Sequence, residues 1–191
     1  MAMFKKNPTK VVLGKRTRWS YVNVWEPKAV GDGTTRKYRI SLIIPKSETE
    51  DYQKIQAAIK AAYEEGAYRL KGNSRTVPPL ESLHTPLRDG DKERPDDPAY
   101  KGCWFINASS TTAPGIVDAN RQAIFDHSEV YSGVYGRASI NFYAYNVNGN
   151  RGIACGLNNL QKISDGEHLG GHVSAKDDFT DDDDNDDDLL G

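Results

Sequence analysis

The sequence predicts a mainly β domain that closes on itself, with one helix in the middle of the chain and an acidic tail behind it. Three observations carry this prediction. Apolar and polar residues alternate in several short segments separated by glycine and proline turn signals, a single segment repeats at helical spacing, and the last fifteen residues hold nine aspartates. The chain suffices for one core, so residues 1–176 are expected to form one domain and residues 177–191 a tail.

Two strands are expected at the start of the chain. The first covers residues 11–25, where alternation places Trp19, Tyr21 and Trp25 on one face. A Gly-Asp-Gly turn signal at 31–33 precedes a second strand over 37–45. Its apolar residues share one face and are expected to enter the core, while its polar face carries Lys37, Arg39 and Ser41.

A helix is expected over residues 47–65. Ser47 and Glu50 have the spacing of a capping box. Apolar residues then recur at helical spacing and predict a stripe that packs on the sheet: Tyr52, Ile55, Ile59 and Ala62. Five prolines between residues 71 and 100 predict a long loop without lasting regular structure.

The remaining strands follow this loop. Strands are expected over 102–109 and 137–145, with an Asn148-Gly149 turn leading into a strand over 152–157, and a small hairpin over 115–125. Counting gives five or six strands and a helix that plugs one end. The economical architecture is an OB-fold, a five-stranded barrel.

The charge is divided between the domain and the tail. Residues 1–176 carry all 25 lysines and arginines against 18 acidic residues, an excess of seven positive charges, whereas the tail carries nine negative charges. A basic domain with aromatic residues between its lysines and arginines suits a polyanion whose bases can stack, and single-stranded nucleic acid is the leading candidate partner.

The residues expected to contact single-stranded DNA are aromatic and basic side chains on strand faces or in the proline-rich loop. They are Arg18, Trp19, Tyr21, Trp25, Lys37, Arg39, Arg88, Trp104, Arg137, Tyr143 and Tyr145. Exposed rings would stack on bases and the cations would pair with phosphates. The alternative is that several of these rings belong to the core, because Trp and Tyr are mostly buried residues.

The tail is expected to be disordered and to bind by charge. Apolar residues set among its acids argue against a mere solubilising role. Two roles remain open, competition for the basic face and docking on a basic partner with apolar pockets. The residues are Asp177, Asp178, Phe179, Asp181, Asp182, Asp183, Asp184, Asp186, Asp187, Asp188, Leu189 and Leu190.

Two catalytic or metal-binding alternatives are weaker. Asp89 and Asp91 could serve a metal-dependent nuclease, but they lie in a loop beside cations that would neutralise them. The same loop could instead form a flap over the binding surface, with Arg88 or Arg94 reaching a phosphate. Cys155, His168 and His172 have half of a zinc-finger spacing without its partner cysteines. Neither an enzyme nor a metal or other cofactor is predicted.

The long blocks of this sequence resemble the phage-encoded OB-fold single-stranded DNA-binding proteins, a group formerly known as a domain of unknown function. The resemblance rests on residues 21–28, 37–46, 85–110, 114–118 and 128–162 and on the Asp-Asp-Phe element at 177–179. It implies a non-catalytic protein that coats single strands during phage replication or recombination. The acidic end is similar to tails that recruit replication proteins and shield the DNA groove, although those commonly finish on an aromatic residue and this one reads Leu189-Leu190-Gly191.

Location and association complete the expectations. No apolar run of membrane-spanning length and no signal-peptide pattern is found, and two cysteines fit a reducing compartment, so a cytoplasmic protein of an infected bacterial cell is expected. Weak binding of RNA or duplex DNA stays open, as does a homodimer formed through a barrel edge or an exchanged tail. A protein-interaction adaptor that acts through its tail is the remaining alternative.

Overall fold

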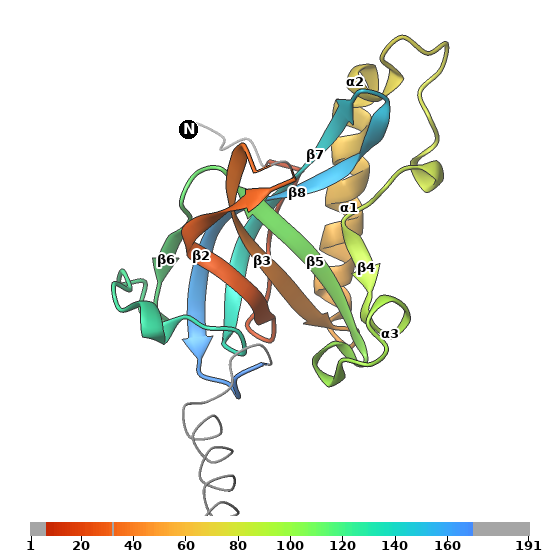
Figure 1. The fold of residues 1–191 in the computed structure, drawn as a ribbon. Coiled ribbons are helices and arrows are strands. Elements are labelled where there is room, and N and C mark those ends of the chain that lie inside the picture. Colours follow the sequence, from red (N-terminus) through yellow and green to blue (C-terminus); the bar gives the residue numbers. More distant parts are fainter. Residues whose placement is uncertain (1–6, 32, 170–191) are drawn as a thin grey trace, which may run out of the picture.

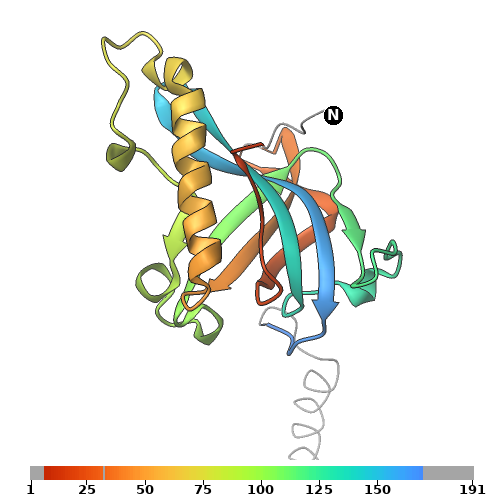
Figure 2. The same cartoon turned by 180° about the vertical axis from the view of Figure 1, so that it is seen from behind.

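A computed structural model describes residues 7–31 and 33–169 of the chain. Within them, eight strands belong to one sheet that rolls into a barrel, with a long helix across its back (Figures 1 and 2). The strands are β1 (Lys10–Val12), β2 (Arg18–Val30), β3 (Thr35–Pro45), β4 (Leu87–Asp89), β5 (Cys103–Ser110), β6 (Gly115–Val117), β7 (Tyr135–Val147) and β8 (Asn150–Ser164). The helices are α1 (Thr49–Glu65), α2 (Ala67–Lys71) and α3 (Gly90–Glu93).

Five of the strands close the barrel. The order β2-β3-β5-β8-β7 returns to β2 where Arg18 pairs with Tyr135, and β5 with β8 is the parallel pairing of this ring. The barrel interior is filled by inward-facing side chains such as Leu42, Ile106 and Ile140, none of which exceeds 2% exposure. This closed five-stranded arrangement confirms the predicted OB-fold. The structure adds three short strands outside the ring: β1 pairs with β7, β4 with β5 and β6 with β8.

The parallel seam between β5 and β8 is narrow. One register pair, Ser109 with Gly156, joins the two strands. Farther along, the segment before β4 fills the wedge, because His84 bridges to Gly152 and its carbonyl accepts the Ile153 N–H at 2.8 Å. By contrast, β7 and β8 pair along their whole length.

The predicted strand over residues 11–25 is wrong in two respects. It is divided into β1 and β2 by a turn, and the Gly14 N–H in this turn donates to the Asp51 carboxylate of α1 at 3.0 Å. In β2, Tyr21 has φ of 46° and the register with β3 shifts between Ser20 and Asn23. Because a bulge reverses the alternation of faces, Trp19 is fully buried whereas Tyr21 is 56% exposed.

The helix begins later than expected and without the predicted capping box. Glu48 occupies the N-cap position and no side chain caps the first turn. The predicted apolar stripe is present, since Ile55, Ile59 and Ala62 are buried and pack against the barrel. Gly66 joins α1 to α2 against β7, where an added Cβ would collide with the Cβ of Ala144. No helix among the described residues is long and apolar enough to cross a bilayer.

The proline-rich segment carries only short elements, as predicted. Residues 90–102, here called the flap, fold back over the outside of β3. Tyr100 of the flap packs with Ile43 and Phe105 in a small second core, and its hydroxyl lies 3.0 Å from the Ser41 hydroxyl. The expected hairpin at 115–125 is reduced to β6 and one bridge between Val117 and Ala123.

Candidate nucleic-acid interface

A groove crosses the outer face of β2, β3 and β5, the strands at the front of Figure 1. Cross-strand pairing places Arg39 beside Ser109 and Ser41 beside Asn107, so residues of two strands share its floor. The side chains that define the groove are Tyr21, Asn23, Arg39, Ser41, Arg94, Asn107 and Ser109. They include two cations and no carboxylate.

Arg94 of the flap forms one wall of the groove. Its guanidinium carbon lies 5.1 Å from the ring centre of Tyr21, 4.9 Å from that of Tyr100 and 5.0 Å from that of Phe105. One terminal nitrogen donates to the Tyr21 hydroxyl at 3.3 Å, while the buried Nε has no acceptor among the described residues. A guanidinium fixed by three rings at the edge of the groove suits recognition of a phosphate through its terminal nitrogens.

The flap is held in place by Lys46 at the end of β3. Its ammonium donates to Asp89 and to Asp91, each at 2.8 Å, and the second oxygen of Asp91 accepts the Gly102 N–H at 2.9 Å. The hydrogen bond from Lys46 is the main cause that lowers the pKa of Asp89. The Gly102 N–H, followed by Lys46, lowers the pKa of Asp91, and the two carboxylates raise the pKa of Lys46.

These contacts bear on the nuclease alternative. A two-metal site needs carboxylates free to ligate ions, but Asp89 and Asp91 are engaged by an ammonium and by backbone N–H groups. Among the residues that the structure describes, no group of three or more His, Cys, Asp or Glu side chains could hold a metal ion. The two aspartates therefore position the flap.

The three tryptophans, all predicted site residues, lie outside the groove. Trp19 is in the core and its Nε1 donates to the Gly136 carbonyl at 3.1 Å. Trp25 stacks on His127 with ring centres 4.2 Å apart, and Trp104 stacks on Tyr52 of α1 at 5.2 Å. Each indole thus has protein against at least one face, and none lines the groove.

The predicted cations also divide. Arg39 lies in the groove, and Lys37 is half-buried two residues before it on β3. Arg18 donates to the carbonyls of Gly133 and Glu167, and Arg88 is paired with Glu93 at 2.8 Å. Arg137 donates to the Leu13 carbonyl at 3.0 Å, next to β1. Of the predicted site residues, the groove brings together Tyr21 and Arg39.

Two predicted tyrosines lie on another part of the barrel. Tyr143 and Tyr145 project from the outer face of β7, where they pair across the sheet with Ala154 and Gly152 of β8. Tyr143 is 39% exposed. Burial, with smaller contributions from Cys155 and Tyr145, raises the pKa of the Tyr143 hydroxyl.

The polar residues of the groove were not identified from sequence. Asn23, Asn107 and Ser109 stand among apolar neighbours and lack any local motif. Strand alternation does place Asn107 and Ser109 outward, and a signal for their role would have required knowledge that β5 lies beside β3. Arg94 was foreseen only as an alternative to Arg88.

The chain that leads to the acidic tail is fixed beside the flap. Lys162, whose side chain is 9% exposed, pairs with Glu129 at 3.0 Å and Asp165 at 2.7 Å. Burial opposes charge on this ammonium, but hydrogen bonds to the two carboxylates outweigh it and raise the pKa of Lys162. Tyr131 contributes a hydroxyl that bonds Asp165 at 3.1 Å and the Gly166 carbonyl at 3.0 Å.

The last described residue continues this attachment. Leu169 donates its N–H to the Ser132 carbonyl at 2.9 Å and packs against the small core of Ile43, Tyr100 and Phe105. The chain therefore reaches residue 169 at the flap, next to the groove. The predicted tail residues from Asp177 to Leu190 lie outside the described residues.

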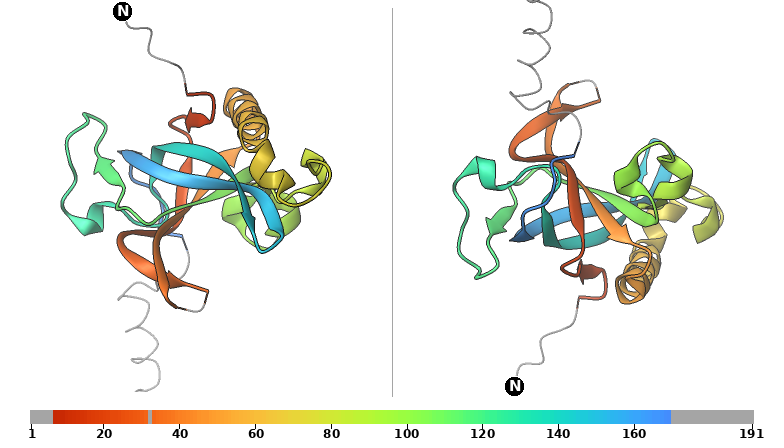
Figure 3. Two further views of the ribbon diagram at one scale, coloured as in Figure 1. Left: turned by 90° about the horizontal axis from the view of Figure 1, so that it is seen from above. Right: turned by 90° about the horizontal axis from the view of Figure 1, so that it is seen from below.

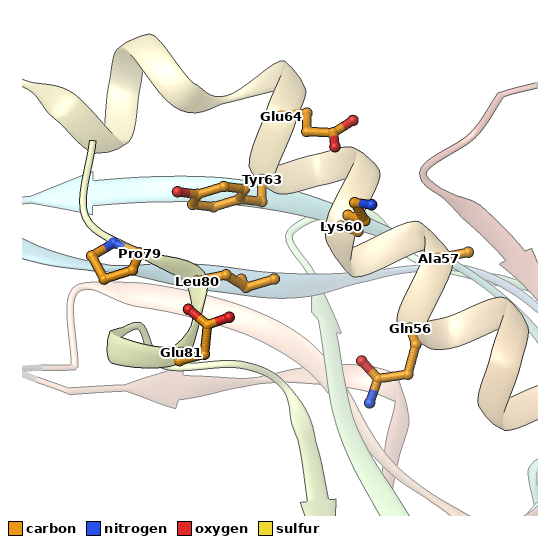
Figure 4. A pocket seen from close by; sticks show the side chains of 8 residues that line it. All are labelled: Gln56, Ala57, Lys60, Tyr63, Glu64, Pro79, Leu80 and Glu81. Atoms are coloured by element: carbon orange, nitrogen blue, oxygen red, sulfur yellow. The ribbon is translucent and has the colours of Figure 1, made fainter. Parts of the chain in front are cut away.

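The hollow between α1 and residues 79–81 suits DNA less well than the groove. Figure 4 shows Lys60 and Glu64 of this hollow on α1 and Glu81 on the facing segment. Two carboxylates beside one ammonium would repel a polyanion.

The structure does not assemble the residues of the zinc-like spacing. Cys155 is in the core, His168 stacks on Tyr131 with ring centres 4.0 Å apart, and His172 is outside the described residues.

Comparison with known proteins agrees with this geometry. The family model of the Enterobacter phage Enc34 single-stranded DNA-binding protein matches residues 9–190. Protein p50 of Acyrthosiphon pisum secondary endosymbiont phage 1 is 32% identical over 171 residues, which cover 86% of this chain and 89% of that protein.

Two solved structures share the fold. The C-terminally truncated bacteriophage Enc34 protein has a TM-score of 0.70 at 23% identity, covering 84% of this chain and 88% of that one. The Enc34 protein in complex with single-stranded DNA has a TM-score of 0.67 at 23% identity, covering 85% and 90%. The family and both structures are named for binding rather than for a reaction, in agreement with the expectation that the chain is not an enzyme. Because the family model spans nearly the whole sequence, the chain belongs to the family of the phage Enc34 single-stranded DNA-binding protein.

Proposed function

We propose that this protein binds and coats single-stranded DNA, without sequence preference, through the groove on β2, β3 and β5. The observation that carries the proposal is the joint placement of the exposed Tyr21 ring and the cations Arg39 and Arg94 on this face. OB-folds bind oligonucleotides on the surface of their second and third barrel strands, which here are β3 and β5.

The chemistry of the groove fits a single strand. An exposed aromatic ring stacks on any base, since every base has a π-face, and each such contact is worth about 1–3 kcal/mol by alanine substitution. Arg39 and Arg94 supply positive charge for the phosphates. The remaining polar groups are short amides and hydroxyls, which can bond sugar or base edges without favouring one base.

We further propose that the acidic tail competes with DNA for this groove and recruits replication proteins of the phage. Support comes from the position of Leu169 at the flap beside the groove, since the chain continues from this residue toward the tail. A tethered competitor acts at a high effective concentration when its attachment lies near its site. The nine aspartates after Lys176 are matched to the basic excess of the preceding residues, and Leu189 and Leu190 supply apolar contacts for a partner.

A titration with fluorescent oligo-dT across a salt series tests both proposals. The proteins compared are the full chain, a chain without residues 177–191, and a full-length chain with all nine tail aspartates changed to asparagine. Binding to oligo-dT is expected for all three. It should be tighter and more salt-dependent for the second and third, because each phosphate contact adds roughly 0.7 to the log–log salt slope and the competitor is absent.

The neutral tail separates charge from bulk. Tight binding by the truncated chain alone would mean that the tail acts by its volume rather than by charge. A full-length chain that binds no oligo-dT even at low salt would contradict the proposed function and favour an adaptor that acts through its tail. Unlabelled duplex DNA and RNA as competitors measure the preference for single strands.

A further inference from the structure

A row of outward-facing residues continues the groove around the barrel. Cross-strand register pairs Asn23 with Arg39, Arg39 with Ser109, Ser109 with Gly156, Gly156 with Asn141, and Asn141 with Lys10. The first three residues belong to the groove. The next three, Gly156, Asn141 and Lys10, continue the row across β8, β7 and β1, which lie above the groove strands in the left view of Figure 3.

The burial pattern confirms that the row faces outward. The chain neighbours of its members point into the core, as Val11 does beside Lys10, Ile40 beside Arg39 and Cys155 beside Gly156. Lys10 and Arg39 are exposed, and the members between them are partly exposed. Six strands spaced by about 4.8 Å give the row a length of roughly 24 Å along the curved surface of the barrel.

The middle of the row is low and smooth. Ser109 and Gly156 have small or absent side chains, and Ala154 lies next to them on β8. The Asn141 amide lies across Gly156, since an added Cβ there would be 2.7 Å from its Oδ1. Glycine inside a strand often marks a place where a ligand or another backbone approaches closely.

Aromatic and basic side chains flank this strip, as they do in the groove. Tyr143, 39% exposed, projects from β7 beside Ala154. At the far end, Lys10 shares a hollow with Lys54 of α1, Arg137 and the 41% exposed Val12. Three cations line that hollow, and one of them, Lys54, is paired with Glu50 at 3.2 Å. A chain of phosphates that leaves the groove over Gly156 would therefore meet positive charge again at Lys10 and Arg137.

We infer that the bound strand does not end at the groove but continues along this row, over the β5–β8 seam, to a second contact at Tyr143 and Lys10. The inference rests on the proposed function and specifies the path of the DNA. A base stacks on Tyr143, phosphates pass over the strip at Ser109 and Gly156, and Lys10 with Arg137 binds the phosphates beyond it.

The test compares oligo-dT of roughly 4 and roughly 16 nucleotides, the limits of site size for an OB-fold. The double variant Lys10→Ala/Tyr143→Ala should weaken binding of the longer strand by about five- to a hundred-fold, the equivalent of one stacked base, and lower its salt slope by roughly 0.7. Binding of the shorter strand should be unchanged. The matched control is Lys71→Ala/Tyr68→Ala, which removes an exposed lysine and a 73% exposed tyrosine on α2, away from the row.

The groove variant Arg39→Ala separates the two proposals. It should weaken both lengths. If it does, but Lys10→Ala/Tyr143→Ala matches the α2 control at both lengths, the path along the row is wrong while the groove stands. If the unmodified protein binds neither length, the proposed function itself fails. Lys10→Glu, a single change of an exposed side chain, gives the same length-dependent loss if the double variant proves poorly folded.

Discussion

The Arg94 guanidinium lies 5.1 Å from the Tyr21 ring centre and donates to the Tyr21 hydroxyl at 3.3 Å. A flap residue and a β2 residue, 73 positions apart, thereby form one wall of the groove. The contact holds the Tyr21 ring by its edge hydroxyl while the side chain stays 56% exposed. Its ring is thus positioned before any ligand arrives, which lowers the entropy cost of binding.

Tyr21→Ala is expected to weaken oligo-dT binding by about 1–3 kcal/mol, because a stacking ring is lost. The melting temperature should change little, since most of this side chain is in water. Trp19→Ala is the contrasting variant, since removing a buried tryptophan costs about 3–5 kcal/mol of folding free energy. Titration and thermal unfolding of both variants check this, and equal stability of the two would refute the burial assignments.

Arg94→Ala is expected to weaken binding and to reduce the salt slope by roughly 0.7, because one phosphate contact is lost. Arg88→Ala serves as its control, since Arg88 is engaged by Glu93 at 2.8 Å and lies outside the groove. The measurement is the slope of log affinity against log salt for each variant. A larger effect from Arg88 than from Arg94 would contradict the placement of the flap.

Native tryptophan fluorescence is expected to respond weakly to oligo-dT, since none of the three indoles lines the groove. From the sequence, Trp19 and Trp25 were expected to stack on bases, which would quench their fluorescence. Tyr21→Trp should create a reporter that is quenched on binding, because a base then stacks on the new indole. Strong quenching of the unmodified protein would place Trp25 or Trp104 in contact with DNA.

The stability that the attachment of the flap provides should depend on pH. The pKa of Asp91 is lowered in the folded state, first by the Gly102 N–H and then by Lys46, so these contacts stabilise the protein above pH 3.8, the ordinary pKa, and lose this effect as pH falls through the folded value. Asp91→Asn should therefore lower the melting temperature at neutral pH, and the difference should shrink below about pH 4. Glu50→Gln, at an exposed helical pair with Lys54, is the control. A difference that persists at pH 3 would mean that the ion pair does not hold the flap.

The barrel strands could be predicted because their faces differ. In β7 the inward residues Ala138, Ile140 and Phe142 alternate with polar residues, and such a period of two fixes both the element and its faces. The alternation in β2 misled for a physical reason: one residue with positive φ, Tyr21, reverses the faces, and nothing in its side chain marks it.

The groove could be predicted only in part. Tyr21 and Arg39 were identifiable as aromatic and basic residues on strands, but which surface they share depends on the neighbours of β3 in the sheet. Arg94 enters the groove through Lys46, Asp89 and Asp91, contacts between segments more than forty residues apart. Asp89 and Asp91, which the sequence shows only as members of a charged cluster, thus hold the flap in place by binding Lys46.

The single register pair between Ser109 and Gly156 makes the β5–β8 seam a weak joint of the ring, as the single pair between Arg18 and Tyr135 does for β2 and β7. Local opening of a folded protein begins where few backbone hydrogen bonds must break, so backbone amides on both sides of this seam should exchange with solvent sooner than those between β7 and β8. A strand of DNA laid from β5 to β8 would bridge the joint and favour its closed form. Binding would then register as slower amide exchange at the seam, so that the ligand would stabilise the barrel that holds it.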